Sequence, residues 1–239
     1  MRVFLAGATG VIGRRLIRLL RDAGMQVVGT TRSPTKAAAL RTLGVEPAVI
    51  DVLDPQALLR AVAAARPDVV IHQLTDLPQS IDPTTLSAAL ERNARLRREA
   101  TPNLMLAAAT AGARRAVVQS VCFAYAEGTR PYREEDPLDQ SPDRKVTVDG
   151  VIALERAALE TPGIEGVVLR YGRLYGPGTW TEVPKGDGPL HVDAAAHAAF
   201  LAITRGKAGL YNIAEDDGSV ATDKAKRDLG FDARFRIDP

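Results

Sequence analysis

The sequence predicts an α/β protein built on a doubly wound parallel sheet. Short apolar runs rich in β-branched residues alternate with longer segments rich in alanine and leucine. Strands that are apolar on both sides are typical of a parallel sheet covered by helices on each face. Three glycines, Gly7, Gly10 and Gly13, follow the first apolar run where the strand pattern changes to a helical one. A strand that leads into a helix through such a turn is the first unit of many folds of this class.

The spacing at which apolar residues recur along the chain predicts the individual strands and helices. We expect seven strands, at residues 2–6, 26–30, 46–50, 68–72, 115–119, 166–170 and 209–213. We expect seven helical segments, at residues 11–23, 34–43, 55–65, 84–111, 147–160, 192–204 and 222–229.

Several helix ends carry local signals. Asp54 before Pro55 predicts an N-cap followed by proline in the first helical position. Pro102 lies inside the segment 84–111 and predicts a kink or a division into two shorter helices. Three glycines are placed where helices should end, at positions 24, 44 and 112.

Composition limits the class of protein. The 239 residues are 46% hydrophobic and 25% charged, which is ordinary for a globular protein, and we expect one domain over residues 1–239. The net charge of +2 is too small to indicate a nucleic-acid partner. The arginines recur mostly at helical spacing, which we interpret as solvated helix faces: Arg14, Arg15, Arg18, Arg21, Arg92, Arg95, Arg97 and Arg98.

A single cysteine, Cys122, excludes an intramolecular disulfide and fits a reducing compartment. The chain opens directly on a strand-like run, without a visible signal peptide, and no apolar run approaches the length of a membrane span. We therefore expect a cytoplasmic protein that has no membrane partner. The three histidines have no cysteine partners at metal-ligand spacing, so no metal site is expected.

The glycine turn predicts a dinucleotide site. Gly7 allows a tight turn out of the strand, Gly10 lets a pyrophosphate approach the backbone, and Gly13 lets the helix pack closely on the sheet. The helix N-terminus then offers free N–H groups and a partial positive charge to the phosphates. The alternative is an ordinary tight turn between a strand and a helix.

The end of the second strand indicates which nucleotide is bound. An acidic residue there would hold the ribose hydroxyls of NAD, whereas an arginine accommodates the 2′-phosphate of NADP. Arg32 occupies this position with Lys36 one turn later, and we expect no acid in reach. NADP(H) is favoured over NAD; the alternative is that Arg32 is simply an exposed residue at the helix entry.

Further motifs follow the glycine turn. Asp51-Val52 comes after the third strand, the fourth strand runs into Leu74-Thr75, and later segments read LRYGRLYGPG at 169–178, LHVD at 190–193 and SVATDKAKRDLGF at 219–231. In these segments the chain resembles the short-chain dehydrogenase/reductase superfamily, in the extended or atypical branch of NAD(P)-dependent nucleotide-sugar epimerases and dehydratases. The resemblance implies a Rossmann-type fold with a small, trimmed C-terminal lobe drawn mostly from residues 171–239. It implies cofactor contacts from Gly7, Thr9, Gly10, Val11, Ile12, Gly13, Thr31, Arg32, Lys36, Asp51, Val52, Leu74, Thr75, Ser120, Tyr171 and Gly172.

The acid–base pair of that family is missing. The family uses a Tyr-x-x-x-Lys motif on one helix, and this sequence contains no such motif. If Glu155 matches the glutamate after the family's lysine, the tyrosine position falls on Thr147 and the lysine position on Val151. Tyr132 and Lys145, in nearby loop sequence, could replace the pair.

The resemblance leaves Ser120 and Tyr125 as the catalytic candidates, because they match the first serine and the tyrosine of the family's "SS…VYG" run. Ser120 could instead only cap a backbone group. We expect an NADP(H)-dependent oxidoreductase or epimerase/dehydratase-like protein that acts on a small carbonyl or sugar-like substrate. The alternative is a non-catalytic NADP(H)-binding sensor or interaction module. The superfamily often dimerises through two long helices, which would be 84–111 and 147–160 here, so a homodimer is a further expectation. The apolar stripe of Leu96, Leu104 and Leu106 could equally face the chain's own sheet.

Overall fold

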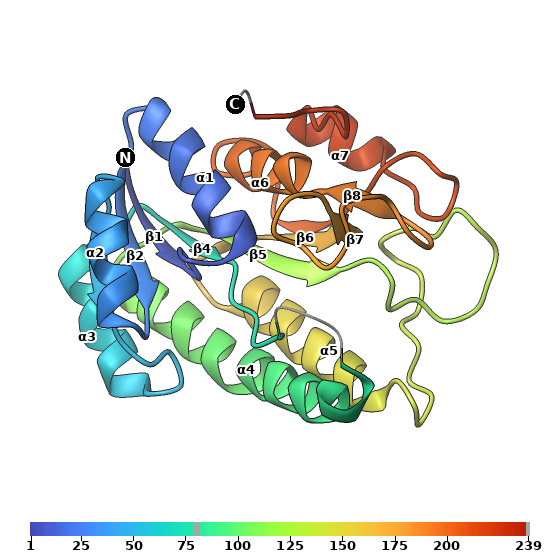
Figure 1. The fold of residues 1–239 in the computed structure, drawn as a ribbon, viewed down its shortest axis with the longest axis horizontal. Helices are drawn as coiled ribbons and strands as arrows, with labels where there is room; N and C mark the ends of the chain where they lie inside the picture. Colours follow the sequence, from blue (N-terminus) through green and yellow to red (C-terminus); the bar gives the residue numbers. More distant parts are fainter. Residues whose placement is uncertain (79–81, 238–239) are drawn as a thin grey trace.

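The computed structural model describes residues 1–78 and 82–237 and contains a seven-stranded, wholly parallel sheet between two layers of helices (Figure 1). The strand order is β3-β2-β1-β4-β5-β6-β9. The order reverses between β1 and β4, which is where ligands bind in open α/β sheets. The strands are β1 (Arg2–Ala6), β2 (Gln26–Thr31), β3 (Glu46–Val49), β4 (Val69–His72), β5 (Arg115–Val121), β6 (Glu165–Tyr171) and β9 (Gly209–Ile213).

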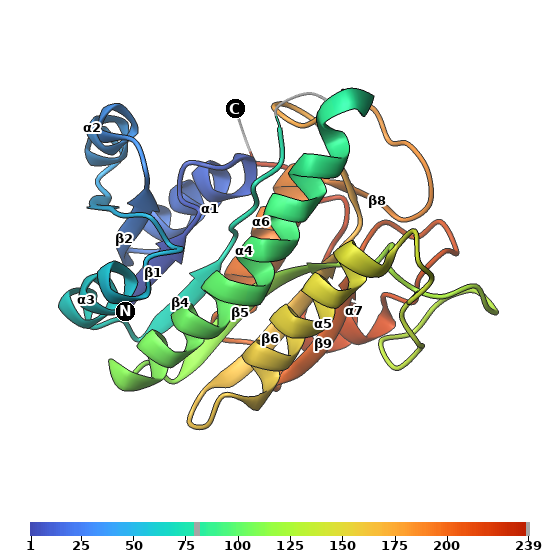
Figure 2. The same cartoon turned by 90° about the horizontal axis from the view of Figure 1, so that it is seen from below.

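Helices cover both faces, because each carries one apolar stripe toward the sheet. One face packs against α1 (Val11–Asp22), α2 (Pro34–Thr42), α6 (Val192–Leu201) and α7 (Asp223–Leu229). The opposite face packs against α3 (Pro55–Ala65), α4 (Pro83–Thr110) and α5 (Lys145–Glu160), and Figure 2 shows α4 and α5 side by side beneath it.

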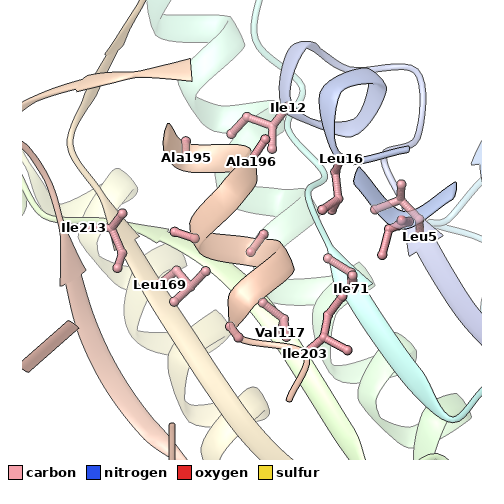
Figure 3. Close-up of a cluster of buried hydrophobic side chains, with 14 of the residues drawn as sticks. Leu5, Ile12, Leu16, Ile71, Val117, Leu169, Ala195, Ala196, Ile203 and Ile213 are labelled. Carbon is pink, nitrogen blue, oxygen red and sulfur yellow. The ribbon is translucent and has the colours of Figure 1, made fainter. Parts of the chain in front are cut away.

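The first of these cores depends on small side chains in α6. Ala195 and Ala196 are fully buried, and Figure 3 shows α6 lying across the sheet, with Leu169 and Ile213 on one side of it and Leu16 of α1 on the other. Without larger side chains in the way, α6 comes close to both the strands and α1.

The sequence predicted all seven strands of the sheet and all seven helices, with ends that differ by at most three residues. The Asp54 carboxylate caps α3 by accepting from the N–H groups of Gln56 and Ala57, at 2.9 and 3.0 Å. Pro102 does not divide its segment, because α4 is a single helix of 28 residues with the proline inside it.

Two short strands were not predicted. β7 (Arg173–Tyr175) and β8 (Pro189–His191) pair with each other in a separate two-stranded sheet. Each has only three residues, too few for an alternating pattern to show. The segment after Tyr171 therefore supplies this small sheet, α6, the edge strand β9 and α7. Within the described residues, no helix has both the length and the apolarity needed to cross a membrane.

Candidate active site

The glycine turn joins β1 to α1 at the carboxyl edge of the sheet. Gly7 has a φ of 93°, and its N–H donates to Thr30 Oγ1 at 3.0 Å. A Cβ on Gly7 would lie 2.5 Å from the carbonyl oxygen of Gln73, and one on Gly13 would lie 2.2 Å from that of Gly7. Both positions therefore require glycine, because the backbone of the turn packs against itself and against the segment after β4.

Gly10 faces outward at the start of α1. It is the N-cap residue, it is exposed, and no side chain caps the helix. The first turn, at Val11, Ile12 and Gly13, contains no acidic residue. Its N–H groups have no partner within the helix and carry the positive end of the helix dipole, which suits a phosphate. A pyrophosphate fits this cradle, which a side chain at position 10 would obstruct.

Arg32 lies directly after β2, beside the glycine turn. Thr31 is buried and its hydroxyl accepts from the Ser33 N–H at 3.2 Å, whereas the Arg32 and Lys36 side chains are exposed. The expectation that no acid is in reach was wrong, because Arg32 Nη2 lies 3.8 Å from Asp76 Oδ1. Asp76 follows β4 and is far from Arg32 in the sequence, so the sequence alone did not predict this contact.

The other predicted nucleotide contacts lie at the same edge, after β3 and β4. Asp51 is exposed and accepts from the Leu53 N–H at 3.0 Å, while Val52 is buried. Leu74 is half-buried and Thr75 is exposed, both directly after the end of β4. The parallel register between β1 and β4 pairs Ala6 with His72 and so brings this segment beside the glycine turn.

Ser120, near the end of β5, is fully buried and donates to Glu155 Oε1 at 2.7 Å. The Glu155 carboxylate also accepts two hydrogen bonds from Arg170, from Nε at 2.8 Å and from Nη2 at 2.7 Å. Both members of this bidentate ion pair are more than nine-tenths buried. Ser120 thus orients a buried ion pair between α5 and β6, which the sequence did not predict.

Tyr125 is joined to the same cluster. Its hydroxyl donates to Asn212 Oδ1 at 2.7 Å and accepts from Arg170 Nη1 at 2.9 Å. Burial raises the pKa of Tyr125 to about 12, although the neighbouring Arg170 acts in the opposite direction. The phenol is therefore protonated at neutral pH and is a weaker acid than free tyrosine.

The end of β6 holds the last two residues predicted to contact the cofactor. Tyr171 is buried and its hydroxyl accepts from Gln73 Nε2 at 3.2 Å, so β6 is tied to the segment after β4. A Cβ on Gly172 would lie 2.1 Å from the carbonyl oxygen of Gly188, so this position requires glycine for close packing.

Neither position of the family's acid–base pair carries a suitable group. Val151 is fully buried and Thr147 is half-buried on α5. Of the suggested replacements, Lys145 forms an ion pair with Asp149 at 2.9 Å. Tyr132 stacks on the Tyr125 ring with centroids 5.3 Å apart. These contacts do not bring Tyr132 and Lys145 together.

Arg97 contradicts the interpretation of the arginines as solvated helix faces. Its side chain, on α4, is only 4% exposed, and burial lowers its pKa to about 10. It lies one turn before Thr101, whose hydroxyl contacts His72 Nε2 at 3.0 Å. The helical period could have identified it, because Asn93 and Thr101, four residues to either side, are buried as well.

A loop from the C-terminal half reaches the segment after β4. Trp180 lies between β7 and β8, and its indole N–H donates to the carbonyl oxygen of Pro78 at 2.8 Å. The ring is partly exposed. In the described part of the chain, no group of three His, Cys, Asp or Glu side chains could hold a metal ion.

Comparison with known proteins identifies the family. The model of the NAD dependent epimerase/dehydratase family matches residues 3–211. A 3-diazoavenalumate denitrifying reductase from a Streptomyces species is 39% identical over 244 residues, covering 92% of this chain and 78% of the relative.

Solved structures share the fold. The UDP-glucose 4-epimerase of Thermotoga maritima, solved with UDP-glucose, has a TM-score of 0.78 at 18% identity, covering 99% of this chain and 94% of the other. The Bordetella bronchiseptica enzyme WbmH, solved with NAD+, has a TM-score of 0.74 at 17% identity, covering 100% of this chain and 94% of the other. The glycine turn, the parallel sheet and the match to the family model together show that this chain belongs to the NAD-dependent epimerase/dehydratase family.

Proposed function

We propose that the protein is an NADPH-dependent reductase that replaces the dinitrogen of a small diazo compound with hydride. Membership of a family of NAD-dependent enzymes supports a nicotinamide reaction. The relative at 39% identity, whose name specifies a reductase that removes nitrogen from a diazo compound, supports this reaction class.

The nucleotide would be held along the edge from β1 to β4. The pyrophosphate fits the first turn of α1 at Gly10, and Asp51 and Val52 flank the adenine position. Arg32 supports the choice of NADP, because its exposed guanidinium can pair bidentately with a 2′-phosphate. When bound, the reduced nicotinamide supplies a hydride.

The observation that carries the proposal is that Thr147 and Val151, at the positions of the family's acid–base pair, are not general acids near neutral pH. Reduction of a carbonyl adds hydride to carbon and also a proton to oxygen. Thr147 and Val151 replace the acid–base pair, the Ser120 proton is donated to Glu155, and the Tyr125 proton is donated to Asn212. Reduction of a carbonyl would therefore proceed without the tyrosine–lysine pair that supplies the proton in the family.

A diazo substrate in its diazonium form removes this requirement. Its carbon–nitrogen bond breaks with both electrons leaving on dinitrogen, and a carbon–hydrogen bond forms with the electron pair of the hydride. Two electrons pass from the nucleotide to the substrate, and no proton enters or leaves. Ser120 and Tyr125 would then position the ion pair that shapes the site rather than transfer protons.

A paired substrate assay tests the proposal. The protein and NADPH are mixed with para-carboxybenzenediazonium or with para-carboxybenzaldehyde, and NADPH oxidation is followed together with formation of benzoate or of the alcohol. We expect benzoate from the diazonium compound, at a rate well above that without protein, and little alcohol. Reduction of the aldehyde alone would favour a carbonyl reductase, and tight NADPH binding without either product would favour the non-catalytic sensor.

The choice of nucleotide has its own test, by calorimetric titration with NADPH and NADH. Arg32→Ala should weaken NADPH binding by about 1–3 kcal/mol, the usual loss for a charge-assisted contact, and leave NADH binding unchanged. Arg41→Ala, an exposed arginine at the end of α2, is the matched control. Equal loss for both nucleotides would contradict a role for Arg32 in binding the 2′-phosphate.

We further propose a cytoplasmic homodimer. The outer faces of α4 and α5 leave Leu106, Ile152 and Leu159 exposed, and apolar residues on two adjacent helices can form an isologous interface. A cytoplasmic location fits the need for NADPH and the unpaired Cys122. Sedimentation velocity should give the mass of a dimer, and Leu106→Glu should give that of a monomer.

A further inference from the structure

Arg97 is a buried cation that forms no direct ion pair with any carboxylate of the described residues. Its Nε atom is inaccessible to solvent and has no hydrogen-bond partner among residues 1–78 and 82–237. Within those ranges, no carboxylate forms an ion pair with its guanidinium, although fourteen other ion pairs of arginine or lysine are present. A buried charge with no partner is costly and therefore requires an explanation.

Glu155 is near enough to Arg97 for its charge to stabilise the cation. However, its two oxygens already accept three hydrogen bonds, one from Ser120 and two from Arg170. One carboxylate therefore faces two buried guanidinium groups, and the cluster has one positive charge in excess. His72, the other titratable group close to Arg97, does not change this balance, because burial lowers its pKa to about 4 and leaves it neutral.

The excess positive charge lies near the carboxyl edge of the sheet, where a substrate would enter. Arg97 is on the part of α4 just beyond the end of β4, as shown by its neighbour Thr101, which contacts His72. β4 is paired with β1, and the glycine turn begins at the end of β1. The same edge of the sheet therefore holds the glycine turn, Thr101 and, one turn before Thr101 on α4, Arg97.

We propose that Arg97 binds a carboxylate of the substrate, in the site that the proposed reductase function assigns to the sheet edge. A carboxylate oxygen would accept from the unpaired Nε–H group and neutralise the excess charge. The interaction would orient the substrate through an end remote from the reacting carbon. Arg97 is thus a specificity-determining residue that favours anionic over neutral substrates.

Fluorine NMR with two unreactive probes tests the assignment. The protein saturated with NADP+ is titrated with para-fluorobenzoate and with its neutral analogue para-fluorobenzamide. The wild type should prefer the carboxylate by about 10- to 100-fold, the range for a charge-assisted hydrogen bond, and Arg97→Met should abolish this preference. Arg97→Lys should retain part of it, and Arg98→Met, at the adjacent exposed position, should retain all of it.

The same samples separate this proposal from the alternatives. If Arg97 only supports the fold, Arg97→Met should lower the melting temperature and leave the preference for the carboxylate intact, which would overturn the proposal. If Arg97 instead binds a phosphate of the nucleotide, the variant should lose NADP+ affinity, which would also overturn it. A wild type that binds NADP+ but shows no preference for the carboxylate refutes only the role of Arg97. A wild type that binds no nucleotide refutes the proposed function.

Discussion

The two halves of the carboxyl edge of the sheet are built from different groups. Along β1 the edge consists of backbone, with Gly7 and Gly13 packed too closely for any side chain and an uncapped helix start at Gly10. Along β5 and β6 it consists of buried side chains, centred on the Glu155–Arg170 ion pair. The first half depends on a local sequence pattern, whereas the second depends on contacts between residues far apart in the chain. The turn and the buried cluster beside it therefore depend on separate sets of residues.

The largest expected effect comes from breaking the buried ion pair. Glu155→Gln leaves Arg170 and Arg97 without a counter-charge, and removal of one partner from a buried pair costs about 3–5 kcal/mol. Urea unfolding monitored by circular dichroism should show this loss in the free energy of unfolding. Glu160→Gln, on the same helix and in an exposed pair with Arg156, is the control and should unfold like the wild type. A similar small change in both variants would mean that the cluster relaxes when the charge is lost.

A smaller effect is expected from acid, through His72. Its Nδ1 lies 3.4 Å from the Leu74 nitrogen, and its Nε2 forms a hydrogen bond with the Thr101 hydroxyl at 3.0 Å. Burial lowers the pKa of His72 from 6.5 to about 4, so the unfolded chain binds the extra proton first as the pH falls. Stability should be complete above pH 6.5 and should fall toward pH 4, by up to about 3 kcal/mol. The difference in unfolding free energy between wild type and His72→Gln, followed across this range, isolates the histidine; a constant difference would contradict the assignment.

The close packing of the glycine turn is tested at Gly13. In Gly13→Ala the new Cβ meets the Gly7 carbonyl, so the turn must shift, at a cost of about 1–3 kcal/mol and with loss of NADP(H) affinity. Gly24→Ala adds backbone strain at a φ of 71° but meets no atom within 4 Å. The control should therefore lose some stability and keep its nucleotide affinity. Calorimetric titration would disprove the packing argument if both variants bound NADPH equally well.

The smallest expected effect concerns Asp76, which lies between the two halves. It faces Arg32 at 3.8 Å and Arg92 at 3.6 Å, so in the free protein it competes with a 2′-phosphate for Arg32. Asp76→Asn should raise the affinity for NADPH by about two- to five-fold, the range for an exposed ion pair, without changing that for NADH. Lower NADPH affinity in this variant would mean that Asp76 holds Arg32 in position instead.

The fold could be predicted almost completely. The spacing of apolar residues and the signals at helix ends, such as Asp54-Pro55, are each contained within a short stretch of sequence. The tight turn between β1 and α1 could also be predicted, because it depends on the spacing of three glycines. The contact of Asp76 with Arg32 and the burial of Arg97 were not predicted. Both depend on residues that are far apart in the sequence and meet only in the folded protein. Arg97 is enclosed where α4 meets α5, and a Cβ on Gly150 would lie only 3.1 Å from the Ala94 backbone. The sequence around Arg97 does not indicate that α4 and α5 pack so closely.

The hydrogen bond from Trp180 to Pro78 has a practical consequence. The chain contains one tryptophan, so its intrinsic emission arises at a single point, in the loop that meets the segment after β4. Reduced nicotinamide absorbs where tryptophan emits, and energy transfer between them depends steeply on their separation. Quenching of this one fluorophore would therefore follow the arrival of the dinucleotide in real time, without any added label.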